Sequence, residues 1–166
     1  MSINYTPGSA TANSYISVAS ADEYFATRSH SESWDSITSA STGTLSATTQ
    51  KENLLKQATR ELDKTYRYHD SKYYQGIRGQ DTYQALEFPR SSNIDADFSL
   101  YIPDEIREAT CEQAAYIKIR AGKKTAIEGV PSEWDVIGTQ TYNYIKGWVN
   151  RQVMGYGSYP WQGSAY

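Results

Sequence analysis

The sequence predicts a mainly α-helical protein: a small helical bundle with long loops and an extended C-terminal arm. Three segments, about 20–27, 49–66 and 103–122, carry apolar residues at helical spacing. The stretches between them are rich in Ser, Thr, Gly and Pro and show little periodicity. A length of 166 residues favours one domain, or one domain plus an arm, over two full domains. We therefore expect a helical domain over 1–130 and an aromatic-rich arm over 131–166.

The first helix should follow a short extended segment, 13–18. Either Ser17 or Ser20 can cap it, and Ser20 with Glu23 has the spacing of a capping box. The helix should run to about Thr27. Its apolar stripe consists of Ala21, Tyr24 and Phe25.

The clearest helix is expected to begin at Thr49 and to run to about Tyr66, because Thr49 and Glu52 repeat the capping-box spacing. Its apolar face consists of Leu54, Leu55, Ala58 and Leu62. The opposite face is basic and should be solvated; it carries Lys51, Lys56, Arg60 and Lys64.

Two long loops flank this helix. Segment 29–49 is dominated by Ser and Thr, so we expect a surface loop that builds no core and that Trp34 and Ile37 pin down. Segment 68–101 has little periodicity, and a connection this long is normally a binding loop or a segment ordered by a partner. Within it, Leu86 and Phe88 alternate toward one side, so they should clamp the loop onto the helices.

The last helix should begin at Pro103, a residue that suits the first helical turn. Asp104 and Glu105 favour a helix N-terminus electrostatically, and Gly122 can end the helix. Its expected buried line is Ile106, Ala109, Gln113 or Ala114, Ile117 and Ala121, with the hydroxyl of Thr110 interrupting the stripe.

The C-terminal segment has a different composition. No Leu follows Leu100, yet 134–166 contains three Trp and five Tyr. Residues 142–153 fit a helical face, although their first part also fits a strand, and 155–166 is typical of an extended arm. Such an arm can insert aromatic anchors into a partner, or stay disordered until assembly. The expected anchors are Tyr142, Trp148, Tyr156, Tyr159 and Trp161.

Composition narrows the function classes. Fifteen Tyr indicate protein interfaces, although partly exposed Tyr on an ordinary fold would give the same count. A net charge of -3 supplies no global positive field for DNA or an anionic membrane. We expect a soluble chain made in the cytoplasm, with no secretion signal and no membrane segment. Cys111 is the only cysteine, which excludes an internal disulfide and predicts a packing role.

No catalytic or metal-binding motif is recognisable in the sequence. His30 and His69 lack ligand spacing, and no nucleophile motif accompanies them. Asp95, Asp97 and Asp104 lack the Gly and the terminal Glu of a calcium loop. We therefore expect no enzyme activity, no cofactor and no metal.

Basic and aromatic residues alternate in the loop 68–101. This combination can stack and neutralise single-stranded DNA, which makes a single-stranded-DNA-binding protein the alternative function. Neighbouring acidic residues favour a protein interface instead. For either ligand, the residues expected at this interface are Tyr73, Tyr74, Arg78, Phe88 and Arg90.

Several segments also occur in a characteristic order: 13–18 (NSYISV), 21–25 (ADEYF), 51–59 (KENLLKQAT) followed by Leu62-Asp63, 84–90 (QALEFPR), and 102–106 (IPDEI) followed by Ala109 and Ala114. Together they resemble the head-to-tail adaptor, or head-completion, proteins of tailed phages. That family is often described as DnaT-like single-stranded-DNA-binding proteins. The resemblance covers roughly the first three quarters of the chain.

The resemblance implies a structural virion protein of the neck, at the head-to-tail interface. It implies a ring, usually of twelve copies, that docks beneath the portal protein through its C-terminal arm. The other face would receive a tail, nozzle or stopper protein, and genomic DNA would pass through the lumen. The alternative remains a DnaT-like single-stranded-DNA-binding protein.

Overall fold

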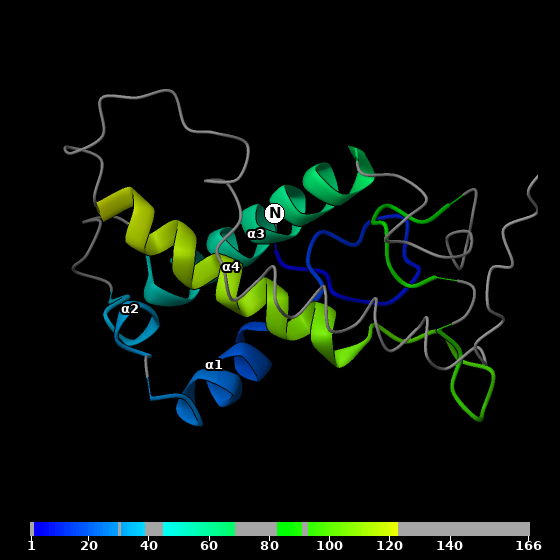
Figure 1. The fold of residues 1–166 in the computed structure, drawn as a ribbon, viewed down its shortest axis with the longest axis horizontal. Helices are drawn as coiled ribbons and strands as arrows, with labels where there is room; N and C mark the ends of the chain where they lie inside the picture. The colour runs from blue at the N-terminus through cyan, green and yellow to red at the C-terminus, as the bar shows by residue number, and fades with distance from the viewer. Residues whose placement is uncertain (1, 30, 39–44, 69–82, 91–92, 123–166) are drawn as a thin grey trace, which may run out of the picture.

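The computed structural model describes residues 2–29, 31–38, 45–68, 83–90 and 93–122 (Figure 1). Within these ranges the chain forms four α-helices: α1 (Val18–Ala26), α2 (Glu32–Asp35), α3 (Ala47–Tyr68) and α4 (Asp104–Gly122). The same ranges contain no sheet, and one isolated antiparallel bridge joins Ile94 to Leu100. The predicted mainly α-helical fold is confirmed. The predicted arm over 131–166 lies outside the described residues.

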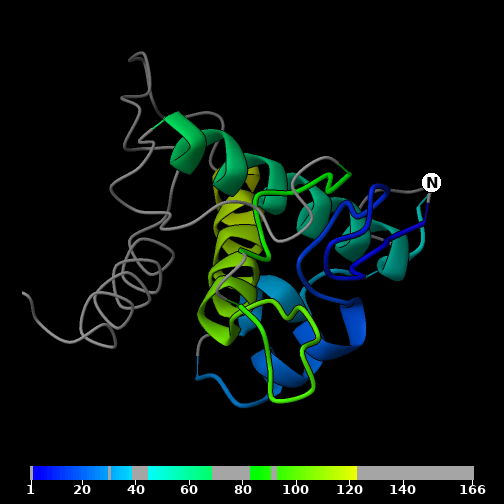
Figure 2. The same cartoon turned by 90° about the vertical axis from the view of Figure 1, so that its right-hand side faces the viewer.

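The two long helices, α3 and α4, cross at the centre of the molecule (Figure 1). At one end of this pair lie α1 and α2, which both pack against α4. At the other end lie segments 83–90 and 93–103 and part of the N-terminal segment 2–17, none of which carries a helix (Figures 1 and 2). Ile3 and Ile16 of the N-terminal segment pack against the core of the first end. We call these two regions the helical end and the loop end.

Helix α1 begins after Ser17, which decides between the two predicted caps. The Ser17 Oγ accepts the N–H of Ser20 at 3.0 Å, so Ser20 lies inside the first turn. The helix ends next to Thr27, as predicted. Ala21 and Phe25 are buried, while Tyr24 is half-buried against the same core.

Helix α2 was not predicted, and the expectation that segment 29–49 builds no core is wrong. Trp34 is 1% exposed and stacks on Phe25 with ring centroids 4.9 Å apart. Its Nε1 donates to a carboxylate oxygen of Asp22 at 2.7 Å. Ile37 is also buried, which confirms that these two residues pin the segment. A single large aromatic ring buries enough area to make core from a Ser/Thr-rich stretch.

Helix α3 begins two residues before the predicted cap. The Oγ of Ser46 accepts the N–H of Thr49 at 3.1 Å, so Ser46 caps the helix and Thr49 lies inside it. The buried Gln50 side chain donates to the carbonyls of Thr38 and Leu45. These bonds hold the segment before α3 against the first turn of the helix. They could not be predicted from the spacing of apolar residues.

Helix α4 begins at Asp104, one residue after the predicted start at Pro103, and its buried surface is wider than the single predicted stripe. Every residue from Ala109 to Ala115 is buried, because α3 covers one side and α1 and α2 cover another. Its polar residues are paired: Glu112 accepts from the Tyr24 hydroxyl at 2.6 Å, and Gln113 donates to Glu61 at 2.8 Å. Because α4 is covered on more than one side, polar residues such as Thr110 are buried among the apolar residues of the predicted stripe.

The buried apolar side chains form two clusters. The cluster of the helical end contains Ile16, Ala21, Phe25, Trp34, Ile37, Leu55, Ala58, Cys111, Ala114, Ala115 and Ile117. The cluster of the loop end contains Ala12, Tyr15, Leu62, Leu86, Phe88, Ile102, Ile106 and Ala109. The expected clamping of the 83–90 segment by Leu86 and Phe88 is therefore consistent with the fold.

Candidate functional site

Among the described residues, no group of three His, Cys, Asp or Glu side chains could hold a metal ion. His30 and His69 lie outside the described residues. Burial raises the pKa of the Cys111 thiol, so a reactive thiolate is disfavoured at neutral pH. The helices of the described part also include none with the length and apolarity needed to cross a bilayer.

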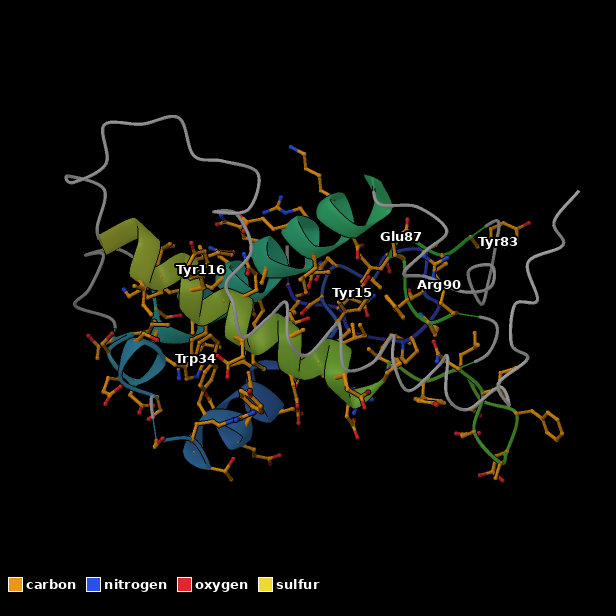
Figure 3. The ribbon with its side chains drawn as sticks, viewed as in Figure 1. Tyr15, Trp34, Tyr83, Glu87, Arg90 and Tyr116 are labelled. Carbon is orange, nitrogen blue, oxygen red and sulfur yellow. The ribbon has the colours of Figure 1, made fainter. Side chains whose placement is uncertain are left out.

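The loop end is fastened by one carboxyl group on α3. The carboxylate of Asp63 accepts one hydrogen bond from the Tyr15 hydroxyl and a second one, at 3.3 Å, from the backbone N–H of Glu87. The Tyr15 oxygen in turn accepts the N–H of Phe88 at 3.3 Å. Burial raises the pKa of Asp63 to about 7, and the two hydrogen bonds oppose that shift. Figure 3 shows Tyr15 and Glu87 at this end of the molecule.

Two of the predicted interface residues, Phe88 and Arg90, pack beside these hydrogen bonds. Arg90 is 7% exposed; its Nη2 lies 2.9 Å from a carboxylate oxygen of Glu87, and its guanidinium lies over the Phe88 ring at 5.6 Å. Figure 3 shows Arg90 beside Glu87. The Phe88 ring meets Tyr15 edge to face with centroids 6.0 Å apart. In this position both side chains face the interior of the chain.

The other predicted site residues lie outside the described part. These are Tyr73, Tyr74 and Arg78 of the loop, and Tyr142, Trp148, Tyr156, Tyr159 and Trp161 of the arm. Within the described part, the structure brings together the two predicted residues that it contains, Phe88 and Arg90.

Three basic side chains lie in a row along one face of α3. Lys56, Arg60 and Lys64 follow one another at four-residue spacing, about 6 Å of helix rise apart. Lys56 reaches Glu52 at 3.4 Å. Arg60 and Lys64 are exposed, and within the described ranges neither makes an ion pair. We call these three residues the cationic row.

Most of the exposed large apolar side chains of the described part belong to the segments of the loop end. Of the seven large ones in the described part, five lie there: Tyr5, Tyr83, Ile94, Phe98 and Tyr101. Exposed large apolar side chains can serve as contact points for a partner. The loop end is therefore the region of the described chain best suited to a partner.

The most exposed of them lies at the tip of a short hairpin, residues 94–100, which we call the finger. Phe98 is 87% exposed and has a φ of 59°, a left-handed conformation that is unusual for a bulky residue. The carboxylate of Asp95 accepts the N–H groups of Asp97 and Ser99 at 2.9 Å each. The finger contains two exposed aspartates and no cation.

The sequence identifies the residues of both features but not their arrangement. The basic face of α3 was expected only to be solvated, and Asp95 and Asp97 were weighed only as metal ligands. The signal for the finger was the segment Asp95-Ala96-Asp97-Phe98-Ser99, in which an aspartate can hydrogen-bond to backbone N–H groups two and four residues later.

Comparison with known proteins gave one family. The family described as "Putative DnaT-like ssDNA binding protein" matches residues 1–146. Neither the curated proteins nor the solved structures gave a match. The matched stretch contains both ends of the described fold, the cationic row and the finger.

Proposed function

We propose that this chain, which belongs to the DnaT-like ssDNA-binding family, is a binding protein for single-stranded DNA and not an enzyme. The observation that carries the proposal is the family match over residues 1–146. The cationic row on α3 supports it, because its exposed members Arg60 and Lys64 lie one turn apart, a spacing at which cations can neutralise phosphates.

The expected affinity is modest and depends on salt. The net charge of -3 opposes the approach of a polyanion, so the row has to act locally. Three phosphate contacts would make the logarithm of the binding constant fall with the logarithm of salt concentration with a slope of about -2. Stacking would come from aromatic side chains, for which Tyr73 and Tyr74 are the sequence-based candidates.

Fluorescence anisotropy with a labelled oligothymidylate at low salt tests this proposal. The double variant Arg60→Gln with Lys64→Gln should bind roughly tenfold more weakly than the wild type, because two of the three charges are lost. Lys118→Gln removes a charge from α4 and is the matched control, with affinity unchanged. Absence of wild-type binding at low salt would overturn the proposal.

Because Arg90 is buried, we expect its substitution to affect stability and not DNA affinity. Because its guanidinium holds Glu87 and lies over Phe88, Arg90→Gln should lower stability at the loop end. Its effect on oligonucleotide affinity should be small once the fold is intact. Tyr73→Ala and Tyr74→Ala should instead weaken binding with little change in stability.

A second candidate function is the head-to-tail adaptor of a tailed-phage virion. The observation that favours it is the group of exposed apolar side chains at the loop end beside the acidic finger, a combination suited to protein contacts. Its partners would be the portal protein, a tail, nozzle or stopper protein, and further copies of the chain, with genomic DNA passing through the lumen. Its place would be the neck of the virion.

The C-terminal residues provide the test of this second function. Deletion of 155–166 should leave the helical domain folded and should produce heads that fail to retain the protein and leak DNA, because aromatic anchors carry the docking. Truncated protein that attaches to portals with wild-type occupancy would contradict that role of the arm. Portal binding without oligonucleotide binding would favour the adaptor over the DNA-binding protein.

A further inference from the structure

We infer that the finger of one copy docks on the cationic row of a second copy, and that this contact and single-stranded DNA exclude each other. The contact itself stands on the two surfaces described above. Only the competition rests on the proposed DNA binding. The occupant of the cationic row on α3 is thus either DNA or the finger of a neighbouring chain.

The finger is built to present its tip in one conformation. The N–H of Asp95 donates to the carbonyl of Ser99 at 3.0 Å, and the N–H of Phe98 donates to the carbonyl of Asp95 at 3.1 Å. Below this turn, the bridge between Ile94 and Leu100 closes the hairpin. An ordered turn loses little conformational freedom on binding, so its ring and its two carboxylates can act together.

The cationic row is complementary to that tip in chemistry. Arg60 and Lys64 offer two exposed charges for the carboxylates of Asp95 and Asp97. The aliphatic stems of these cations give the Phe98 ring an apolar surface, and the guanidinium can lie over the ring face. Nucleic acid is a poor ligand for the finger, since both aspartates repel phosphate.

The finger cannot contact the cationic row of its own chain. Figures 1 and 2 both show the loop before α4 projecting on the side of the molecule away from α3. The contact must therefore be head to tail, with the finger of each chain on the row of the next. Such a contact leaves a free finger and a free row at the two ends of a dimer, so assembly continues beyond two copies.

Sedimentation velocity of the full chain at low salt, with a charge swap, tests the contact. Asp97→Lys and Lys64→Glu should each lower the self-association constant by roughly tenfold or more, since each places like charges together. An equimolar mixture of the two variants should associate as the wild type does, because each variant offers a surface that fits the other. Glu32→Lys, the same charge change on α2, is the control and should leave association unchanged.

The ring of Phe98 is tested separately. Phe98→Asn removes the ring while asparagine tolerates a positive φ, so the turn should survive. This variant should keep the wild-type melting temperature and lose self-association by roughly fivefold or more. A monomeric wild type at low salt, or charge variants that sediment as the wild type does, would overturn the contact.

Addition of excess oligothymidylate separates this inference from the proposed function. If both hold, the oligomers should dissociate into smaller DNA-bound species. Oligomers that persist with DNA bound would overturn the competition. An oligonucleotide that fails to bind, together with a successful charge swap, would overturn the proposed function and leave the finger contact supported.

Discussion

The helical end and the loop end are held together by different interactions. At the helical end, apolar side chains from four helices meet, and the stacked rings of Phe25 and Trp34 lie at their centre. At the loop end, a carboxyl group, a phenol and backbone N–H groups fasten segments without helix onto α3. The segments of the loop end carry five of the seven exposed large apolar side chains of the described part, whereas Leu45 and Ile119 are the two that lie elsewhere. The region with the weaker periodicity is the one suited to recognition.

The largest expected effect comes from breaking the helical end. Trp34→Ala removes a 1% exposed ring from the stack on Phe25 and should destabilise the fold by about 4 kcal/mol. Urea unfolding followed by far-ultraviolet circular dichroism measures this loss. Tyr83→Ala is the matched control, since a ring that is 74% exposed should cost less than about 0.5 kcal/mol. Equal losses in the two variants would contradict the assignment of the core.

The next effect concerns the pH dependence that Asp63 gives to the loop end. Its pKa is raised to about 7 in the folded chain, whereas the unfolded group keeps its ordinary value near 4. Between pH 4 and pH 7 the unfolded chain therefore binds fewer protons, and this group lowers the stability as pH rises, by up to roughly 4 kcal/mol. Above pH 7 the contribution is constant.

Asp63→Asn tests this pH dependence, because the amide keeps an acceptor for Tyr15 and cannot ionise. The free energy of unfolding of the wild type, relative to the variant, should fall as pH rises from 4 to 7. Urea titrations at four pH values across that range measure the difference. Parallel profiles for the two proteins would show that Asp63 titrates normally.

Phe88→Ala should have a somewhat smaller effect, because it truncates the clamp of the loop end while the helical end stays packed. We expect a loss of about 3 kcal/mol, from the cavity left beside Tyr15. Amide hydrogen exchange should show the loss concentrated in 84–90 and in 12–16. No measurable loss of stability would show that the clamp is absent.

The smallest effect is expected at the finger. Phe98→Gly relieves a left-handed conformation and removes an exposed ring, so it should change stability by less than about 1 kcal/mol in either direction. Thermal unfolding measures it. A loss above 2 kcal/mol would mean that the Phe98 ring packs within its own chain.

The sequence predicts the helical end better than the loop end, for physical reasons. Phe25, Leu55 and Ala58 follow helical spacing, so their burial could be predicted from periodicity. The cap at Ser46 could not be predicted from the motif, because Thr49 and Glu52 have capping-box spacing whereas Ser46 has Thr49 three residues later. Trp34 was recognised as an anchor, but its short helix depends on tertiary packing.

At the loop end, the burial of Leu86 and Phe88 could be predicted from alternation, but the fastening could not. The bond between Tyr15 and Asp63 joins residues far apart in the chain, and nothing in either local sequence indicates it. Arg90 shows the same limit: beside aromatic residues it resembles a nucleic-acid contact, whereas its geometry pairs it with Glu87. The cationic row was recognised as a basic face without a ligand.

The salt dependence of single-stranded-DNA binding tests the central claim, that the cationic row on α3 contacts phosphates, most directly. The slope of the logarithm of the binding constant against the logarithm of salt concentration should be about -2 for the wild type. For the variant that carries Arg60→Gln and Lys64→Gln it should be about -0.7, because one of three phosphate contacts remains. An unchanged slope in that variant, or no binding by the wild type at low salt, would contradict the claim.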